Sequence, residues 1–353
     1  MSAVDVPGGD AAGPVDLRSD TVTRPSPGMR RAMAGAEVAD DVLEKDPTAR
    51  RLEERVAGLL GTGAALFFPS GVQANQAAVL LQAAPGTEVV CEAEAHVFHY
   101  ELADVAMLAR AQLHRVPSGD GVPELEPWRA AFRPGDRHHP VTSLACLENT
   151  HNLHGGVVVP LERLRALADV AWERGVPVHL DGARLWNAAE ASGVGLESYA
   201  ACADTVMLSL SKGLGCPVGS ILAGPEELIE RAWSVRKRLG GGMRQVGILA
   251  AAGLYALDHN LERLGRDHER ARRLAAGCDA LDGLRAPTPE TNIVMIHVER
   301  DDVTPDELSD RLEERGVLLL AAGSGRLRAV THLDVDDRAI DRALEAIRDA
   351  LPD

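Results

Sequence analysis

The feature that most constrains the fold is a repeated alternation of short apolar runs with longer segments of helical spacing. The short runs are rich in β-favouring residues and end at turn signals, which predicts buried strands. These runs lie at residues 64–68, 88–92, 142–148, 177–181 and 205–209. The intervening segments read as helices: residues 46–61 offer Asp46 as N-cap, Pro47 at the first helical position and Gly61 as a stop. Strands that alternate with helices imply a largely parallel sheet covered on both faces.

The length of the chain indicates more than one folding unit. At 353 residues it exceeds the size at which a single core usually stops growing. We expect a large domain over residues 16–258 and a smaller C-terminal α/β domain over residues 259–353. Residues 243–277 are long and helical in pattern, and strand–helix–strand–strand–helix spacing follows. The Gly/Pro/Asp-rich opening, residues 1–15, predicts a flexible arm.

Charge and composition exclude several classes of function. A formal net charge of −16 disfavours binding to nucleic acid or anionic lipid, because both require basic surface. No apolar run reaches the roughly 18 residues needed to span a bilayer, and the first residues lack a signal-peptide pattern. The five cysteines form no CxxC pair, and most lie in apolar segments typical of buried free thiols. We therefore expect a protein of the reducing cytoplasm that binds neither nucleic acid nor membrane.

Polar residues follow two successive predicted strands. Asp181 ends one apolar run, Arg184 lies on the following turn, and Lys212 follows the next strand, 31 residues after Asp181 (212 − 181). Asp181 could simply cap the next helix with Arg184 as its ion-pair partner. Alternatively, Asp181 could hold the protonated ring nitrogen of pyridoxal phosphate (PLP), with the Lys212 amine bonded to the aldehyde of that cofactor. Each residue by itself is compatible with either interpretation.

Two further stretches are compatible with a bound cofactor. Ser70 and Gly71 begin a predicted helix, where backbone N–H groups and the helix dipole attract phosphate, although Pro-Ser-Gly is also an ordinary turn. No GxxxxGK[ST] motif is present, so this is not a nucleotide P-loop. His96 follows a predicted strand, where an imidazole could stack on a flat ring or have a structural role instead.

These stretches together resemble the low-specificity L-threonine aldolases, in the group that also contains the β-eliminating lyases. The motifs occur in family order from Asp16 to Asp334: "DLRSDTVTRPSPGMRRAM", "DDV" and "DPT", "PSGVQAN", "EAHVFHYE", "ENTHNLHGG", "HLDGARLWNA", "SLSKGLGCPVGS", "RKRLGGGMRQVGILAAAGLYAL" and "RLRAVTHLD". The resemblance implies the aspartate-aminotransferase-like fold (PLP fold type I). That fold has a mostly parallel seven-stranded sheet with helices on both faces and a small C-terminal α/β domain.

The resemblance also implies which residues bind the cofactor. Lys212 would be the Schiff-base lysine, Asp181 the partner of the pyridinium nitrogen, and Arg184 a ligand of the ring hydroxyl. Ser70 and Gly71 would bind the phosphate. No metal is implied.

Other positions are implied to contact the amino acid substrate. His96 would be a base stacked on the cofactor ring, and His151 would lie near the substrate β-hydroxyl. Ser19 and Arg328 would hold the α-carboxylate, which Arg328 can grip through two parallel hydrogen bonds.

The resemblance further implies a homo-oligomer. Lys237 and Arg244 would reach the phosphate or its surroundings from a neighbouring subunit, which requires at least a dimer, and tetramers are frequent in the family. The chain departs from the family pattern at Val72, where a hydroxyl is usual, and at Leu43 and Glu44, which replace tyrosine and glycine. Val72 removes a hydroxyl expected on the phosphate and predicts weaker PLP retention, whereas Leu43 and Glu44 bear on the natural substrate more than on the type of reaction.

The implied reaction is reversible retro-aldol cleavage of L-threonine, L-allo-threonine and related β-hydroxy-α-amino acids to glycine and an aldehyde. One alternative is a PLP-dependent β-eliminating lyase that acts on another β-substituted amino acid and forms a 2-oxo acid and ammonia. A second alternative, from a different class, is a catalytically silent PLP-binding or interaction protein.

Overall fold

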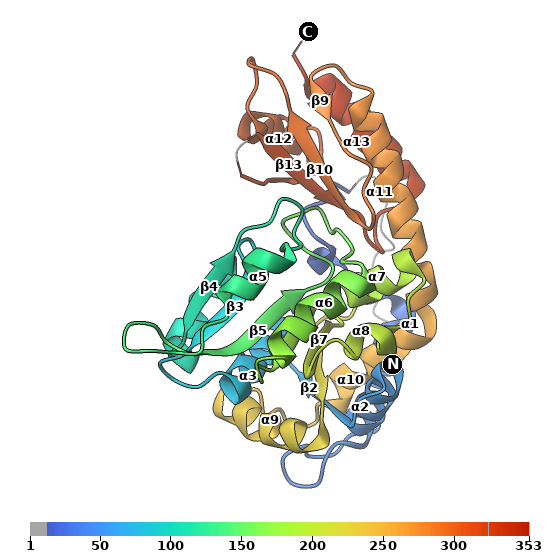
Figure 1. Ribbon diagram of the computed structural model, residues 1–353. Coiled ribbons are helices and arrows are strands. Elements are labelled where there is room, and N and C mark those ends of the chain that lie inside the picture. Colours follow the sequence, from blue (N-terminus) through green and yellow to red (C-terminus); the bar gives the residue numbers. More distant parts are fainter. Residues whose placement is uncertain (1–12, 324, 353) are drawn as a thin grey trace.

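The alternating pattern folds into a mostly parallel seven-stranded sheet (Figure 1), in a computed structural model that describes residues 13–323 and 325–352. The strand order is β2-β8-β7-β6-β5-β3-β4, and only the pairs of β8 with β7 and with β2 are antiparallel. The strands are β2 Ala64–Phe68, β3 Glu88–Glu92, β4 Gln112–Val116, β5 Thr142–Glu148, β6 Val178–Gly182, β7 Thr205–Ser209 and β8 Ser220–Gly224. The predicted fold class is confirmed.

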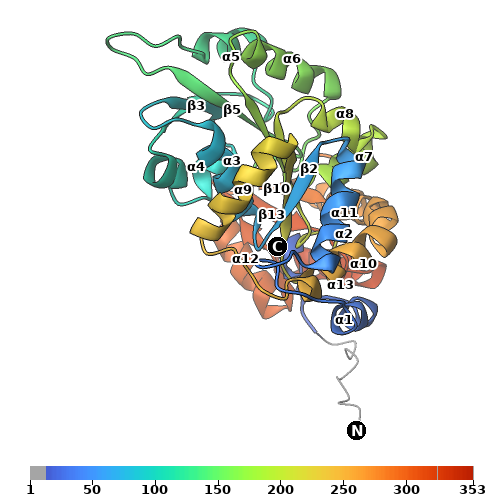
Figure 2. The same cartoon turned by 90° about the horizontal axis from the view of Figure 1, so that it is seen from below.

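Helices cover both faces of this sheet (Figures 1 and 2). The helices of the larger lobe are α1 Pro27–Ala34, α2 Pro47–Leu60, α3 Gly71–Gln82, α4 His96–His99, α5 Leu125–Ala131, α6 Leu161–Trp172, α7 Leu185–Ser192, α8 Leu196–Ala200, α9 Glu226–Arg238 and α10 Gly247–His259, with the short helical segments η1 Asp20–Val22 and η2 Val105–Ala109. Helix α2 has the predicted ends: Asp46 accepts from the amides of Thr48 and Ala49, and Gly61 closes the helix at φ +63°.

The two faces of the sheet can be distinguished by residue parity, because side chains alternate along a strand. Phe68 and Met207 pack with α3 and α9 on one face. Phe67 and Leu208, one position away, pack with α2, α6, α7 and α10 on the other. The first face is called the α3 face below, and the second the α6 face.

Two strands of the seven-stranded sheet, β4 and β8, were not predicted. Strand β4 lies at the sheet edge and is only partly buried, so its sequence QLHRV has no apolar run. Strand β8, SILAG, is fully buried, but the glycine-rich turn before it obscures where it begins. The long helical segment from residue 243 is also divided, because α10 ends next to Asn260, whose side chain donates to Leu214 O (2.8 Å).

The C-terminal lobe has a four-stranded sheet of order β12-β13-β10-β9. Its elements are η3 Leu261–Arg263, α11 Leu264–Asp279, β9 Leu284–Arg285, β10 Ile293–Val298, α12 Pro305–Glu314, β11 Val317–Leu318, β12 Leu320–Ala321, β13 Arg326–Val330 and α13 Asp337–Ala350. The run VLLLAA, predicted as one strand, forms two strands with different partners. Strand β12 pairs with β13, whereas β11 pairs in parallel with β1 (Val15–Asp16).

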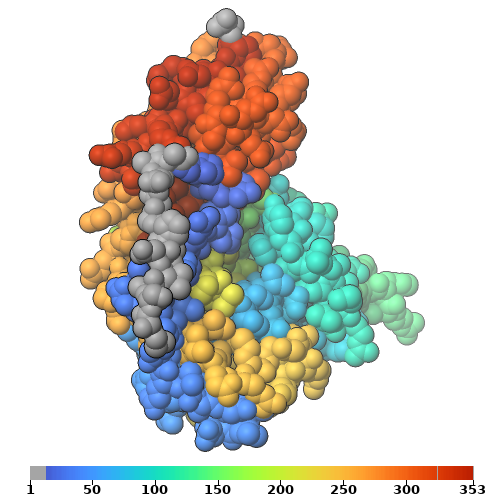
Figure 3. All heavy atoms as spheres, turned by 180° about the vertical axis from the view of Figure 1, so that it is seen from behind, coloured from blue at the N-terminus to red at the C-terminus, as the bar shows by residue number. Residues whose placement is uncertain are grey.

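The segment from Val15 to Thr23, which begins at the last residue of the predicted arm, connects the two lobes. Val15 and Leu17 are buried in the core of the C-terminal lobe, and this segment, blue in Figure 3, lies against that lobe. Thr23, a few residues later, donates from its hydroxyl to Lys212 O (3.0 Å) in the larger lobe. The predicted flexible arm, residues 1–15, falls mostly outside the described residues, and the proposed domain limits remain predictions.

Two general expectations can be compared with the described residues. All five cysteines are buried free thiols. Within residues 13–323 and 325–352, no helix is both long and apolar enough to cross a membrane.

Candidate active site

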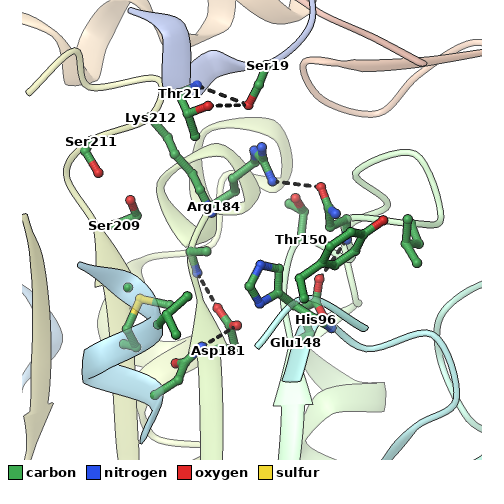
Figure 4. A pocket seen from close by; sticks show the side chains of 18 of the residues that line it. Ser19, Thr21, His96, Glu148, Thr150, Asp181, Arg184, Ser209, Ser211 and Lys212 are labelled. Carbon is green, nitrogen blue, oxygen red and sulfur yellow. Dashed lines mark hydrogen bonds between the residues drawn. The ribbon is translucent and has the colours of Figure 1, made fainter. Parts of the chain in front are cut away.

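A cavity of about 420 Å³ opens where the carboxyl ends of the parallel strands meet the C-terminal lobe (Figure 4). Such strand ends are the usual ligand crevice of α/β sheets. Eight of the eleven predicted site residues line it: Ser19, Ser70, Gly71, His96, Asp181, Arg184, Lys212 and Arg328. The other three, His151, Lys237 and Arg244, do not.

Residue parity explains which strand-end side chains enter this cavity. Glu148, Asp181 and Ser209 lie at the ends of the adjacent strands β5, β6 and β7. Glu148 is paired with Asp181 and Asp181 with Met207, which packs on the α3 face, and Ser209 is two residues after Met207. All three side chains therefore lie on the same side of the sheet as the N-terminus of α3. The cavity is therefore built where three strand ends and one helix N-terminus converge.

Lys212 follows β7 and is anchored through its backbone. Its carbonyl accepts from the Thr23 hydroxyl (3.0 Å) and from Gly215 N (2.9 Å), and Gly215 has φ +75°, which a glycine adopts without strain. Burial, and then the charge of Arg184, lower the pKa of Lys212 to about 8, against the opposite effects of nearby carboxylates. The neutral, nucleophilic amine is thus much more populated near neutral pH than in an ordinary lysine, although the protonated form still predominates.

Asp181 is held from two sides. Its Oδ1 accepts from Ala183 N (3.0 Å), and its Oδ2 accepts from Asn75 Nδ2 (2.8 Å). Burial favours the protonated form, but the positive charges of His96 and Lys212 hold the pKa of Asp181 below its ordinary value. The carboxylate therefore remains ionised inside the protein, as a partner of a cationic group must.

Arg184 pairs with Asp20 and not with Asp181. Its Nε donates to Asp20 Oδ2 and its Nη2 to Asp20 Oδ1, both at 2.7 Å, and both side chains are buried. Arg184 Nη1 donates to Asn152 Oδ1 (3.2 Å). Helix α7 begins after Arg184 without a side-chain cap. The simpler interpretation, in which Asp181 caps this helix and pairs with Arg184, is therefore wrong.

Hydroxyl groups gather at the α3 end of the cavity. Ser70 is the N-cap of α3 and accepts from Gln73 N (3.2 Å), so its own hydroxyl proton is free for a ligand. Ser209 and Ser211 line the same cavity, and so does Val72. These two serines were missed from the sequence, although their positions three and one residues before Lys212 place them beside it. The set of hydroxyls at a helix N-terminus fits a phosphate.

Arg328 comes from β13 of the C-terminal lobe. Its Nη2 donates to Asn152 Oδ1 (2.8 Å), whereas its buried Nε has no hydrogen-bond partner among the described residues. Burial, and then the charge of Arg184, lower the pKa of Arg328 to about 10, so the guanidinium stays protonated at neutral pH. Ser19, which accepts from Thr21 N (3.2 Å), lines the same cavity. An unpartnered cationic N–H is suited to a carboxylate ligand.

His96 begins α4 on the opposite wall. Its backbone N donates to Glu148 Oε2 (2.7 Å), and its ring Nδ1 lies 2.9 Å from Glu101 Oε1. The side chain remains 27% exposed. The imidazole is thus fixed at one nitrogen and accessible from the cavity.

His151 lies behind the cavity wall, on the α6 face. Its Nε2 is 2.9 Å from Glu92 Oε2, and the ring is 1% exposed, close to Leu164 and Leu167 of α6. Glu92 has the parity of Val90, which packs on that same face. The ion pair therefore orients His151 away from the cavity that its neighbours Thr150 and Asn152 line.

Lys237 and Arg244 lie near the end of α9 and after it, and both are exposed. Arg244 pairs with Asp40 (3.1 Å). Neither contacts the cavity of its own chain.

Comparison with known proteins agrees with this architecture. Residues 16–301 match the family model described as "Beta-eliminating lyase". A low-specificity L-threonine aldolase of Arabidopsis thaliana is 42% identical over 344 residues, which is 96% of each chain. The solved structure of a threonine aldolase from Leishmania major superposes with a TM-score of 0.80 at 20% identity, covering 95% of this chain and 98% of the other. A serine palmitoyltransferase solved with PLP superposes with a TM-score of 0.74 at 20% identity, covering 95% and 86%.

The two structural likenesses define the fold, which is that of the aspartate-aminotransferase-like class (fold type I). The sequence matches go further: the chain belongs to the β-eliminating lyase family and, within it, to the group of low-specificity L-threonine aldolases. The family resemblance inferred from the motifs is confirmed.

The buried ion pair gives a stability prediction. Asp20→Ala leaves the Arg184 guanidinium buried without its partner, which typically costs about 3 to 5 kcal/mol. We expect urea denaturation to report a loss of that size. Asp16→Ala is the matched control, because Asp16 pairs with the exposed Arg18 and such pairs contribute about 0 to 1 kcal/mol. Equal losses in the two variants would contradict the structural importance of the Asp20–Arg184 pair.

Proposed function

We propose that this chain is a PLP-dependent enzyme that reversibly cleaves L-threonine, L-allo-threonine and related β-hydroxy-α-amino acids to glycine and an aldehyde. The principal support is the presence, in one cavity, of a lysine of lowered pKa and an aspartate kept ionised, together with an arginine that has a free N–H. The names of the relatives at over 40% identity point to the same reaction.

The side chains of the cavity fit PLP. Lys212 would bind the aldehyde carbon, Asp181 would accept from the protonated ring nitrogen, and Arg184 would contact the ring hydroxyl. The phosphate would lie against Ser70 and the amide of Gly71 at the N-terminus of α3. When bound, PLP supplies an electron sink for the pair released when a bond at the substrate Cα breaks.

Two residues are suited to hold the substrate carboxylate. Arg328 stays charged, lines the cavity and has a buried Nε without a partner among the described residues, and Ser19 offers a hydroxyl from another segment that lines the cavity. An arginine that binds a carboxylate through two N–H groups fixes rotation of the substrate as well as its position. We propose that this orients the Cα–Cβ bond for cleavage.

Cleavage requires that the β-hydroxyl of the substrate lose its proton. His96 is the base that we assign to this step, because it lines the cavity and its Nε2 has no hydrogen bond to the residues that the structure describes. His151 is buried behind Thr150 and Asn152, so we propose that it supports this wall through Glu92 and that any effect on the β-hydroxyl is indirect. A positioned base of this kind usually contributes about 10²- to 10⁴-fold in rate.

We also propose that the enzyme is a homo-oligomer of at least two subunits, and a tetramer by family resemblance. Lys237 and Arg244 are exposed cations outside their own chain's cavity, which is compatible with a role at a neighbouring subunit's phosphate site. Five buried free thiols support the expectation of a reducing, cytoplasmic environment.

Product identity tests the proposed reaction. Incubation with L-threonine and L-allo-threonine is expected to release acetaldehyde and equimolar glycine, measured by mass spectrometry. A 2-oxo acid with ammonia would instead indicate β-elimination. The absence of both sets of products would favour a silent PLP-binding protein. Lys212→Ala is the control for contaminating activity.

The three lysines of the chain, Lys45, Lys212 and Lys237, make covalent attachment simple to map. After reduction with borohydride, we expect the cofactor on the peptide that contains Lys212 and no labelled peptide in Lys212→Ala, because that amine alone lines the cavity. Lys45→Ala and Lys237→Ala should keep the label on the Lys212 peptide, since neither removes the amine that bonds to the cofactor. Undiminished labelling of Lys212→Ala would remove Lys212 from its assigned role.

Arg328→Ala should raise KM for threonine about 100-fold, because it removes charged hydrogen bonds of about 1.5 to 3 kcal/mol each. PLP content, measured by absorbance, should change little. Arg326 lies two residues earlier on β13 and provides the comparison variant, Arg326→Ala. If Arg326→Ala raised KM and Arg328→Ala did not, Arg326 would be the carboxylate anchor.

A further inference from the structure

Glu101 is a buried carboxylate with no role in the function proposed so far. It follows α4, ends the stretch EAHVFHYE, and is 2% exposed. Its Oε1 lies 2.9 Å from His96 Nδ1 and accepts from Asn75 Nδ2 at 2.8 Å. One oxygen atom therefore contacts both the proposed base and the residue that holds Asp181.

The contacts around Asn75 determine which of its amide atoms donates and which accepts. Asn75 Nδ2 lies 2.8 Å from Asp181 Oδ2 as well as from Glu101 Oε1, and both of these are acceptors. The Asn75 carbonyl must then accept, and His179 Nε2 at 3.0 Å is its donor. His179 Nδ1 consequently accepts from the Thr205 hydroxyl (2.9 Å). This chain of bonds orients the amide so that both carboxylates receive a proton donor.

The same logic fixes the tautomer of His96. In this contact Glu101 Oε1, which also accepts from Asn75 Nδ2, is the acceptor, so His96 Nδ1 carries the hydrogen and Nε2 of the neutral imidazole is left with a lone pair. Nε2 has no hydrogen bond to the described residues, and the ring lines the cavity. The available nitrogen is therefore the one suited to receive a proton from a ligand.

We propose that Glu101 is a positioning residue for His96: its carboxylate keeps the imidazole proton on Nδ1 and leaves Nε2 to take the proton from the β-hydroxyl of the substrate. The inference rests on the function proposed above. Through Asn75, the same oxygen atom also fixes His96 relative to Asp181, so the base and the cofactor partner are held as one unit.

The charges that face His96 agree with this arrangement. They are Glu101 from the segment after α4, Glu148 from the end of β5 and Asp181 from the end of β6. Burial alone would lower the pKa of His96, but the hydrogen bond to Glu101 and these three charges outweigh it, so the pKa is raised. Burial and the charge of Glu101 raise the pKa of neighbouring Asp104 to about 7. Part of the Asp104 population is then uncharged at neutral pH, which limits its repulsion of Glu101.

The substitution Glu101→Gln removes the negative charge of the side chain and keeps its shape. Glutamine can still accept from His96 and Asn75 through its oxygen, and its amide can donate toward Asp104, so folding should be preserved. Removal of the negative charge should move the titration of His96 about one pH unit lower, since a carboxylate partner shifts a pKa by about one to three.

This titration can be measured without catalysis. Diethyl pyrocarbonate modifies only the neutral imidazole, and mass spectrometry of the modified peptide follows His96 as a function of pH, with the cofactor bound and after its removal. Exposed His99, three residues later in the same peptide, is the internal reference. We expect the midpoint for His96 to fall in Glu101→Gln, to return toward the original value in Glu101→Asp, and to stay unchanged in Glu94→Gln. Glu94 provides the matched control because it lies on the same segment but pairs with His154.

Kinetics provide the second measurement. The acid limb of kcat for threonine should shift with the His96 midpoint, and the plateau of kcat should fall about tenfold or more with KM nearly unchanged, because a less basic imidazole is a weaker base. An unchanged His96 midpoint in Glu101→Gln would overturn the inference, whatever the loss of activity. If the midpoint shifts but the unmodified enzyme releases no aldehyde from threonine, Glu101 still positions His96 and the proposed function is wrong.

Discussion

Asp20 carries a charge with no access to water, and the Arg184 guanidinium neutralises it through two hydrogen bonds of 2.7 Å. An unpaired buried carboxylate would raise the free energy of the folded protein. The Asp20 carboxylate must therefore lie beside Arg184, whose position is set by the larger lobe. Asn292 of the C-terminal lobe donates to the same carboxylate (3.2 Å), and Asn152 accepts from Arg184 and from Arg328 alike. Polar contacts thus run from one lobe to the other, and they place Arg328 against the cavity that contains Lys212.

The cavity must also satisfy two electrostatic requirements. Asp181 has to stay ionised and Lys212 has to lose its proton easily, and positive neighbours favour both. His96 and Lys212, when protonated, hold the pKa of Asp181 below its ordinary value, and Arg184, permanently charged, lowers the pKa of Lys212. The Asp20 carboxylate balances Arg184, so the cavity gains this effect without a buried, unpaired cation. Charge of both signs is thus distributed so that lysine and aspartate are each shifted in the useful direction.

Much of this could be predicted from the sequence, and the rest depended on information that local patterns do not contain. Apolar runs located β2, β3, β5 and β7 to the residue because these strands are buried on both faces, whereas edge strand β4 has no such run. The motifs located Lys212, Asp181 and Arg328. They could not reveal Asp20 as the partner of Arg184, since 164 residues separate the two. The orientation of His151 depends on the parity of Glu92 within β3, which is known only once the register of the sheet is known.

The departures from the family pattern can now be placed. Val72 lines the cavity in which we propose that PLP binds, but Ser70, Ser209 and Ser211 line it too, so the missing hydroxyl removes only one of several donors, about 0.5 to 1.5 kcal/mol. Leu43 is different: it is 80% exposed and lies outside its own chain's cavity, in the turn that contains Asp40, the ion-pair partner of Arg244. Where Arg244 reaches the site of a neighbouring subunit, as we propose, Leu43 lies beside that site too. An apolar side chain would then border the neighbour's cavity where relatives present a tyrosine, and selectivity for the aldehyde portion of the substrate would depend on that contact between subunits.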